Sequence, residues 1–350
     1  MRVAIWTTAS LEPEYEAVSK EIQVISKALN NCWIFSVSQH ITFRFSWKNR
    51  ILAFNPKFYV IVRIIFPMIE RLFDANLVYG DVSPWIYHKA LTRKPIVHTV
   101  TQTSKKPVVE FLHRCSEIVV QTAATRDQII NLGISESKVH LWYPGLDLNI
   151  YHPIKKTQSK TTRILFATAP RSKYEMHSRG CYLLIDTAKK VTDVSFRFLY
   201  RPWRSGYTSL ETTKQAIVDS GVINIELSNT AVAEMNKVYC DYDYTIVPYT
   251  EEGGGKECPN SVVEGLACGV PVLISNKCPF AQFVIDNNCG LVFEPTVSGL
   301  VEAINKSKEV ADELSMSARK VAIIHFNIAE TVSKYKSMLA ILISHNQLEG

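Results

Sequence analysis

Short β-branched runs alternate with amphipathic stretches along most of the chain, which is the pattern of parallel strands joined by helices. In the first half this pattern predicts strands at RVAIW (2–6), NLVYG (76–80), PIVHTV (95–100), EIVVQ (117–121) and VHLWY (139–143). Helices are expected over 14–30, 58–73, 84–92 and 124–132. Residues 122–133 have a polar start, apolar spacing and a terminal glycine, as expected of a capped helix.

The alternation breaks at 143–162, where Pro144, Gly145, Pro153 and a lysine-rich run predict a linker. It then restarts, with strands expected at RILFAT (163–168), SFRFLY (195–200), VINIEL (222–227), YDYTIVPY (242–249) and PVLIS (271–275). Helices are expected over 180–190, 208–219, 230–238 and 260–268, and the stretch 313–343 is helical by period. The pattern therefore predicts an α/β chain of two doubly wound, Rossmann-like domains facing across a cleft.

Composition agrees with this organisation. A chain of 350 residues exceeds what one core usually serves, and its net charge of +6 weakly favours anionic partners. The eight cysteines form no C-x-x-C pair, and most lie among apolar neighbours, which indicates small buried side chains in a reducing compartment. With neither a signal-peptide pattern nor an apolar run long enough to span a bilayer, the sequence predicts a cytoplasmic protein.

The segment KFYVIVRIIFPMIERLF (57–73) is rich in aliphatic and aromatic residues, interrupted by Lys57, Arg63 and Arg71. Arg63 and Pro67 make it a poor membrane span. Two interpretations stay open: a buried helix of the first domain, or an element lying on an anionic membrane with its basic residues toward the headgroups. The second would make the protein peripheral at the inner face of a membrane.

The stretch CPNSVVEGLACGVPVLIS (258–275) follows a strand and the glycine run EEGGGKE (251–257). Pro259 fixes the chain before a short helix that Asn260 or Ser261 is expected to cap, and Gly269 is expected to close that helix. The N–H groups at such a helix start suit a diphosphate. Gly254 and Gly255 let the backbone approach a ligand closely. Glu264, one turn inside the helix, is placed to accept hydrogen bonds from ribose hydroxyls.

YDYTIVPYTEEGGGKECPNSVVEGLACGVPVLIS resembles the donor-site segment of family 4 glycosyltransferases, retaining enzymes of the GT-B fold. VHLWYPGLDLNIYHP resembles the interdomain segment of that family, and SRGCYLLIDTAKK (178–190) the start of the first helix of its second domain. ARKVAIIHFNIAETVSKY resembles its closing helices. The resemblance implies an acceptor-side domain over 1–153, a nucleotide-sugar domain over 154–320 and a C-terminal helix, 321–350, that returns to the first domain.

The resemblance also assigns roles. Glu264 corresponds to the second of two family glutamates, the one that binds ribose, and Arg179 takes the place of the lysine that contacts the diphosphate. Arg171 is a looser candidate for the partner arginine. The first family glutamate is replaced by Lys256, with Glu257 one step later, so either Glu257 or Lys256 would meet the donor sugar.

In the first domain, Thr101 takes the place of the family's usual histidine, with His98 three residues earlier; both are candidates for the cleft. The implied function is transfer of a sugar from a nucleoside-diphosphate donor to a glycan, lipid-linked or small-molecule acceptor, with retention and without a cofactor or metal. Polysaccharide biosynthesis is the expected setting. Two alternatives stay open: a non-catalytic relative that partners another glycosyltransferase, and a GT-B epimerase or phosphorylase.

Other motifs are weaker. Asp241-Tyr242-Asp243 spells a metal-binding D-x-D, but it begins a strand, and short motifs are common by chance. The sequence has neither a G-x-G-x-x-G after a strand nor a P-loop. Arg201 and Arg204 follow a strand and would add positive potential for a donor. No recognisable nucleic-acid module occurs, so nucleic acid is not an expected partner.

Overall fold

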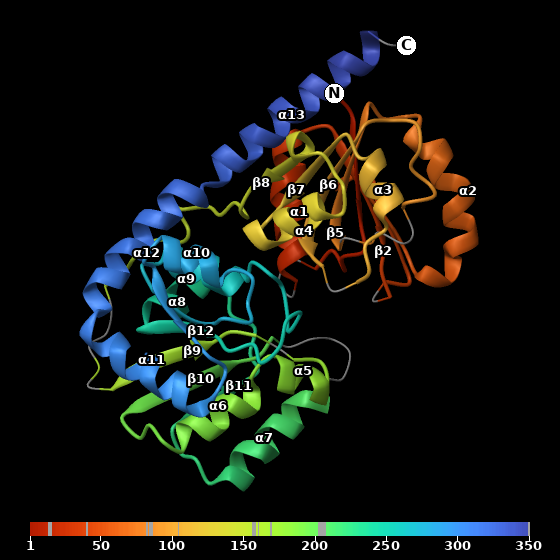
Figure 1. The fold of residues 1–350 in the computed structure, drawn as a ribbon. Helices are drawn as coiled ribbons and strands as arrows, with labels where there is room; N and C mark the ends of the chain where they lie inside the picture. Colours follow the sequence, from red (N-terminus) through yellow and green to blue (C-terminus); the bar gives the residue numbers. More distant parts are fainter. Residues whose placement is uncertain are drawn as a thin grey trace. The chain divides into compact units, whose positions relative to one another are not determined.

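The computed structural model describes residues 1–12, 16–39, 41–81, 83, 87–103, 105–155, 159, 161–168, 170–201 and 208–348. Figure 1 shows the fold. The chain divides into two compact units, the first comprising Met1–Gly145 and Ala329–Gly350 and the second Leu146–Ile328. The division between Gly145 and Leu146 lies inside the Pro/Gly-rich segment 143–162. Each unit has its own sheet.

The sheet of unit 1 has the order β3-β4-β2-β1-β5-β6-β7-β8 and is parallel except where β3 pairs antiparallel with β4. The strands are β1 (Val3–Thr7), β2 (Cys32–Val37), β3 (Phe43–Ser46), β4 (Ile51–Phe54), β5 (Ala75–Asp81), β6 (Ile96–Gln102), β7 (Glu117–Val120) and β8 (Val139–Leu141). Since β2 and β5 flank β1, the strand order reverses at β1 and β5. The carboxyl ends of these two strands are where a doubly wound sheet usually binds ligands.

Helices cover both faces of this sheet because its strands are apolar on both sides. The helices of unit 1 are α1 (Ala17–Leu29), α2 (Tyr59–Glu70), α3 (Val109–Arg114), α4 (Ala123–Asn131) and α13 (Ile328–Leu348), with 3-10 turns η1 (Pro56–Phe58) and η2 (Glu136–Lys138). α1 and α13 share one core, and α2, α3 and α4 share the core on the other face. Tyr335 of α13 is buried and shares a 2.8 Å hydrogen bond with the hydroxyl of Thr99 on β6.

Unit 2 has a fully parallel six-stranded sheet in the order β11-β10-β9-β12-β13-β14. Its strands are β9 (Thr162–Phe166), β10 (Val194–Leu199), β11 (Ile225–Ser228), β12 (Tyr244–Val247), β13 (Val272–Ser275) and β14 (Gly290–Phe293). The order reverses between β9 and β12, so the segments that follow these two strands flank the expected ligand position of the unit. The predicted α/β class with two Rossmann-like halves is confirmed.

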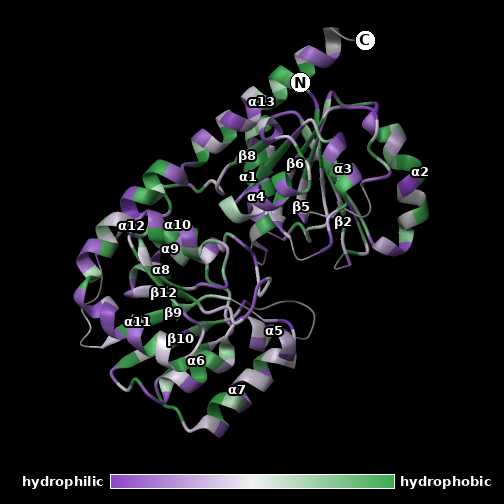
Figure 2. Cartoon of the chain, in the orientation of Figure 1, coloured by the Kyte–Doolittle hydropathy of each residue, from purple (hydrophilic) through white to green (hydrophobic). Residues whose placement is uncertain are grey.

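The helices of unit 2 are α5 (Lys173–Ser178), α6 (Cys181–Ala188), α7 (Thr208–Ser220), α8 (Met235–Cys240), α9 (Asn260–Ala267), α10 (Ala281–Asp286), α11 (Val297–Glu309) and α12 (Ala311–His325). α6 and α11 pack on one face of the sheet, and α9 and α10 on the other. Figure 2 shows hydrophobic and hydrophilic residues alternating along these helices, as expected of helices with one buried side. The result is a separate core for the unit that carries the candidate donor site.

Most predicted elements lie where the pattern placed them. The pattern missed four strands, β2, β3, β4 and β14, and four helices, α3, α5, α10 and α11. The helix predicted over 84–92 is wrong for its described residues, because 87–90 form a turn; residues 84–86 lie outside the described part of the chain. All eight cysteines are buried, and none of them forms a disulfide in the part of the chain that the structure describes. Within the described residues, no helix is both long and apolar enough to cross a bilayer.

Candidate donor site

The segments after β9 and β12 meet at the end of α5. Thr168 follows β9, and its hydroxyl accepts a 3.0 Å hydrogen bond from Nη1 of Arg179, which ends α5. The segment after β12 is fixed to the same helix end, because the N–H of Thr250 donates to the Ser178 carbonyl at 3.0 Å and its hydroxyl donates to the His177 carbonyl at 2.8 Å. Arg179 therefore lies at the position where the strand order of unit 2 reverses.

Arg171 and Arg179 are brought together by Glu175. Nη2 of Arg179 lies 3.1 Å from one Glu175 carboxylate oxygen, and Nε of Arg171 lies 3.2 Å from the other. The backbone N–H of Arg171 also donates to this carboxylate at 2.8 Å. Arg171 is exposed, whereas Arg179 is mostly enclosed, and its Nε is buried with no hydrogen-bond partner among the described residues. A guanidinium held in this way keeps a donor for an anionic ligand.

The glycine run packs closely against this region. A Cβ on Gly254 would lie 2.5 Å from the Ser178 carbonyl oxygen, and one on Gly255 would lie 2.3 Å from the Tyr249 hydroxyl. Both distances are too short for any side chain. Burial raises the pKa of Tyr249, which keeps its hydroxyl protonated as the 3.3 Å donor to the Lys256 carbonyl. The glycines thus hold the loop against α5, beside Arg179.

The start of α9 differs from the prediction. The helix begins at Asn260 with Pro259 as N-cap and has no side-chain cap hydrogen bond, so the expectation that Asn260 or Ser261 caps it is wrong. The reason is that Asn260 is already the first helical residue, and its side-chain oxygen accepts a 2.6 Å hydrogen bond from the Lys256 ammonium instead. The N–H groups of Asn260 and Ser261 precede the first hydrogen bonds of the helix, in which Val262 and Val263 donate to the Pro259 carbonyl. Gly269 closes the helix at φ +75°, as predicted.

Glu264 is buried inside unit 2 with a hydrogen-bonded neighbour. The hydroxyl of Tyr239 donates to a Glu264 carboxylate oxygen at 3.0 Å. Burial and the nearby Glu264 charge raise the pKa of Tyr239 well above its ordinary value, so this hydroxyl remains a donor, and the charge of Arg201 acts in the opposite direction. Tyr239 therefore fixes the carboxylate that the sequence assigns to ribose, while Arg201 lies near enough to add positive potential. Arg204 lies outside the described residues.

The two residues at the position of the missing family glutamate have different surroundings. The Glu257 side chain is buried, and its carbonyl accepts from the Cys278 thiol at 3.5 Å. Lys256 is partly exposed, with its ammonium beside Asn260 at the helix start. The Lys256 ammonium therefore adjoins the first turn of α9.

The D-x-D motif has a structural use. The Asp243 carboxylate accepts a 2.6 Å hydrogen bond from the N–H of Arg163, and the Asp243 N–H donates to the Arg163 carbonyl at 2.8 Å. This two-way bonding fixes the start of β12 beside β9. No group of three potential metal ligands occurs among the residues the structure describes.

The two candidates of unit 1 lie on β6. His98 is fully buried, with Nδ1 3.3 Å from the Val78 carbonyl and its ring edge-on to Phe111. Burial lowers the pKa of His98 to about 4, so the imidazole is neutral at physiological pH. The expectation that His98 lines a cleft is corrected: its side chain belongs to the core, because β6 is a central strand covered on both faces. Thr101 is buried and donates to the Gly80 carbonyl at 3.2 Å.

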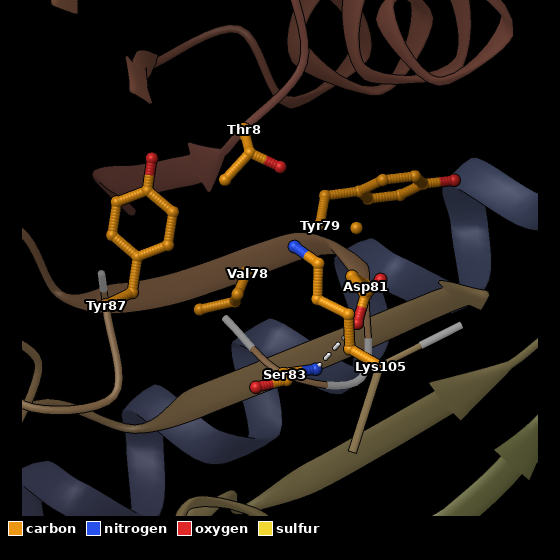
Figure 3. Close-up of a pocket in the computed structure, with 8 residues that line it drawn as sticks. Thr8, Val78, Tyr79, Asp81, Ser83, Tyr87 and Lys105 are labelled. Atoms are coloured by element: carbon orange, nitrogen blue, oxygen red, sulfur yellow. Dashed lines mark hydrogen bonds between the residues drawn. The ribbon is translucent and has the colours of Figure 1, made fainter. Parts of the chain in front are cut away.

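A small pocket opens at the carboxyl ends of β1 and β5, where the strand order of unit 1 reverses (Figure 3). Thr8, Asp81, Ser83 and Lys105 are among the polar residues that line it, and the cavity of about 10 Å³ has room for about one water. One Asp81 oxygen accepts from the Ser83 N–H at 3.0 Å and the other from Gln102 at 3.3 Å. Thr101 does not line this pocket, but it is hydrogen-bonded to Gly80, which does.

Four contributors to the site of unit 2 were missed by sequence reasoning: Thr168, Glu175, Tyr239 and Tyr249. Glu175 had a usable signal, because it lies four residues after Arg171 and four before Arg179, a spacing that pairs charges on a helix. The sequence gives no comparable signal for Thr168 or Tyr239, because each contacts its partner only in the folded structure.

Comparisons with known proteins bear on this site. Residues 172–308 match the family model described as Glycosyl transferases group 1. No curated protein shows significant similarity to the chain. The matched segment contains Glu175, Arg179, the glycine run and α9.

Three solved structures share the fold of the whole chain. Anabaena Alr3699/HepE in complex with UDP and glucose is 14% identical, with a TM-score of 0.75 over 96% of this chain and 99% of that one. A glycosyltransferase from Rickettsia africae is 15% identical, with a TM-score of 0.75 over 98% of each chain. Sucrose-phosphate synthase from Thermosynechococcus elongatus is 10% identical, with a TM-score of 0.76 over 99% of this chain and 100% of that one. The fold is that of GT-B glycosyltransferases, and together with the domain match it indicates a glycosyltransferase, as predicted.

Proposed function

We propose that the protein transfers a sugar from a nucleoside-diphosphate donor to a hydroxyl of a glycan, lipid-linked or small-molecule acceptor, with retention, as family 4 enzymes do. A reducing, cytoplasmic setting and a role in polysaccharide biosynthesis form part of the proposal. The observation that carries it is the position of Arg179, whose partly unsatisfied guanidinium lies where the strand order of unit 2 reverses. The complexes of Anabaena Alr3699/HepE with UDP and with UDP-glucose support a nucleotide-sugar donor here.

The residues divide the binding task by their chemistry. Arg179 offers a planar fork of donors that suits phosphate oxygens, and the first-turn N–H groups of α9 suit the same charge. Glu264, fixed by Tyr239, accepts hydrogen bonds from ribose hydroxyls. Lys256 lies near the α9 start and favours a donor whose sugar or phosphate presents negative charge at that point.

The proposed step needs no enzyme nucleophile. The bond between the anomeric carbon and the phosphate oxygen breaks, and the acceptor oxygen bonds to that carbon on the face the phosphate leaves. The acceptor proton passes to an oxygen of the departing diphosphate. Arg179 and the α9 amides stabilise the charge that develops on this leaving group, which is the largest contribution such a site makes.

The test is a panel of nucleotide sugars screened for thermal stabilisation, followed by an assay for nucleoside diphosphate release with an acceptor. A ligand at one hundred times its Kd stabilises by about 2.7 kcal/mol, which raises the melting temperature by several degrees. We expect one base and sugar class to give this shift and Glu264→Ala to lose it. No stabilisation by any nucleotide sugar, with the protein folded, would refute the proposal.

A non-catalytic binding role is favoured by one observation, the lysine at the position of the first family glutamate. The two functions separate cleanly. The binding role would be supported if a nucleotide sugar stabilised the natural protein without release of diphosphate, and if the Lys256→Glu variant did release diphosphate. Release by the natural protein supports the enzyme.

A further inference from the structure

Helix α2 presents a line of apolar side chains to solvent. Val60, Ile64, Met68 and Leu72 are all more than 60% exposed. Because they are spaced four residues apart, they lie along one side of the helix and its C-terminal extension. The opposite side carries Phe66, which is fully buried and packs against Trp6 at 4.8 Å between ring centroids. The helix is therefore anchored by one face and exposes apolar side chains on the other.

The β3–β4 hairpin adds aromatic side chains to this surface. Phe43, Phe45 and Trp47 are between 54% and 74% exposed at the edge of the sheet. The ring of Phe54 on β4 lies 5.6 Å from that of Phe43 and 6.3 Å from that of Phe66. Phe54 thus connects β3 to α2 on one face of the sheet. The hairpin–α2 surface is defined by these exposed residues: Phe43, Phe45, Trp47, Val60, Ile64, Met68 and Leu72.

The charged residues of the segment that carries this surface are mostly basic. Between Ile41 and Phe73 the sequence has six basic residues and one acidic residue, Glu70. Lys48, Lys57, Arg63 and Arg71 are exposed. Glu70 is fully buried, where its carboxylate accepts from the Asn76 side chain at 2.8 Å and from three backbone N–H groups at 92–94. The only carboxylate of the segment is thus turned into the core, and the exposed charges of the segment are positive.

We propose that the hairpin–α2 surface docks on an anionic lipid bilayer. Exposed aliphatic and aromatic side chains with basic residues beside them match the acyl boundary and the negative headgroups of such a bilayer. A tryptophan at the rim suits the headgroup level. A second copy of this chain fits less well, because its own lysines and arginines would face those of the first. α2, at 12 residues, is too short to cross a bilayer, so the contact is interfacial.

The inference does not depend on the donor, so the test uses the full chain without any nucleotide sugar. Flotation is measured with phosphatidylcholine vesicles with and without phosphatidylglycerol, at low and high salt. One variant, Ile64→Ser/Met68→Ser, removes apolar contact, and another, Arg63→Glu/Arg71→Glu, reverses charge. Since all four side chains are exposed, the variants should fold.

Matched controls come from surfaces elsewhere on the chain. Ile223→Ser removes the most exposed isoleucine, in unit 2, and Lys334→Glu/Lys336→Glu reverses two exposed charges on α13. Circular dichroism and the melting temperature report folding in every variant.

We expect binding to the anionic vesicles that weakens at high salt and falls by about tenfold or more in both test variants, with both controls unchanged. Equal binding to neutral vesicles, or equal loss in the controls, would overturn the proposal. So would a concentration-dependent dimer that Ile64→Ser/Met68→Ser abolishes, because that result would assign the surface to a second copy. Donor binding is measured on the same variants, so that a failure of the membrane proposal can be distinguished from a failure of the proposed function.

Discussion

Substitution of Gly180 tests how closely the start of α6 is held against the segment after β12. Gly180 has φ +76°, and a Cβ built on it would lie 1.9 Å from the Pro248 carbonyl oxygen. Gly180→Ala therefore combines two costs. The left-handed backbone costs about 1–2 kcal/mol, and the clash with backbone costs about 1–3 kcal/mol more, since a carbonyl cannot rotate away. The expected loss is about 2–5 kcal/mol.

Gly221→Ala is the matched control. Gly221 has φ +70°, but its added Cβ would meet no atom within 4 Å. It carries the same backbone cost and the same entropic gain from alanine in the unfolded chain, so both terms cancel in the comparison. The free energies of unfolding of the two variants, measured in urea, should differ by about 1–3 kcal/mol. This difference is the cost of the clash with the Pro248 carbonyl alone.

The close approach also positions the site, because Arg179 directly precedes Gly180. Gly180→Ala should weaken donor binding, and Gly221→Ala should not. Equal stability losses in the two variants would refute the packing argument, and unchanged donor binding in a destabilised Gly180→Ala would refute its link to the site.

Three further predictions concern buried or paired charges. Glu175→Gln removes the carboxylate that neutralises Arg179, so affinity for the diphosphate donor, measured by calorimetry, should rise about two- to fivefold; a loss would mean that Glu175 acts by holding Arg179 in place. His98 takes up a proton at about pH 6.5 when unfolded but only at about pH 4 when folded, so the free energy of unfolding should fall as the pH drops between these values, by up to about 1.4 kcal/mol per unit. Urea unfolding at several pH values should show this slope flattened in His98→Leu, and an unchanged slope would contradict the assignment. Asp243→Ala leaves the Arg163 N–H without its carboxylate, so thermal unfolding should show a loss of about 1–3 kcal/mol; a stability equal to the parent would contradict this role.

The sequence predicts the central strands well because they are buried on both faces and so read as mostly apolar runs, as in β1. It fails at the edges. β3 alternates phenylalanine with Arg44 and Ser46 over only four residues, and its position comes from pairing with β4. β14 begins at Gly290, which is required because a Cβ there would lie 2.1 Å from the Val272 carbonyl. Neither the position of β3 nor the start of β14 can be predicted from the local sequence.

The candidate site divides in the same way. α9 and the glycine run were found because proline and glycine mark the ends of elements, and Glu264 was found because it is a lone carboxylate among apolar residues. The partners of these groups depend on tertiary structure: Tyr239 approaches Glu264 only when α8 packs on α9, and Thr168, which follows β9, contacts Arg179 only when the end of α5 returns to that segment. His98 shows the converse error, since strand position alone does not distinguish a core imidazole from an exposed one.

The most direct test of the account is calorimetric titration of the Arg179→Ala variant with the nucleotide sugar that best stabilises the natural protein. Arg126→Ala serves as control, because Arg126 also pairs with a carboxylate, Glu136, but lies on α4 of unit 1. Loss of charge-assisted hydrogen bonds to a diphosphate should weaken binding about tenfold to a hundredfold in Arg179→Ala and leave Arg126→Ala unchanged. Equal donor affinity in Arg179→Ala and the natural protein would contradict the claim that this arginine holds the diphosphate.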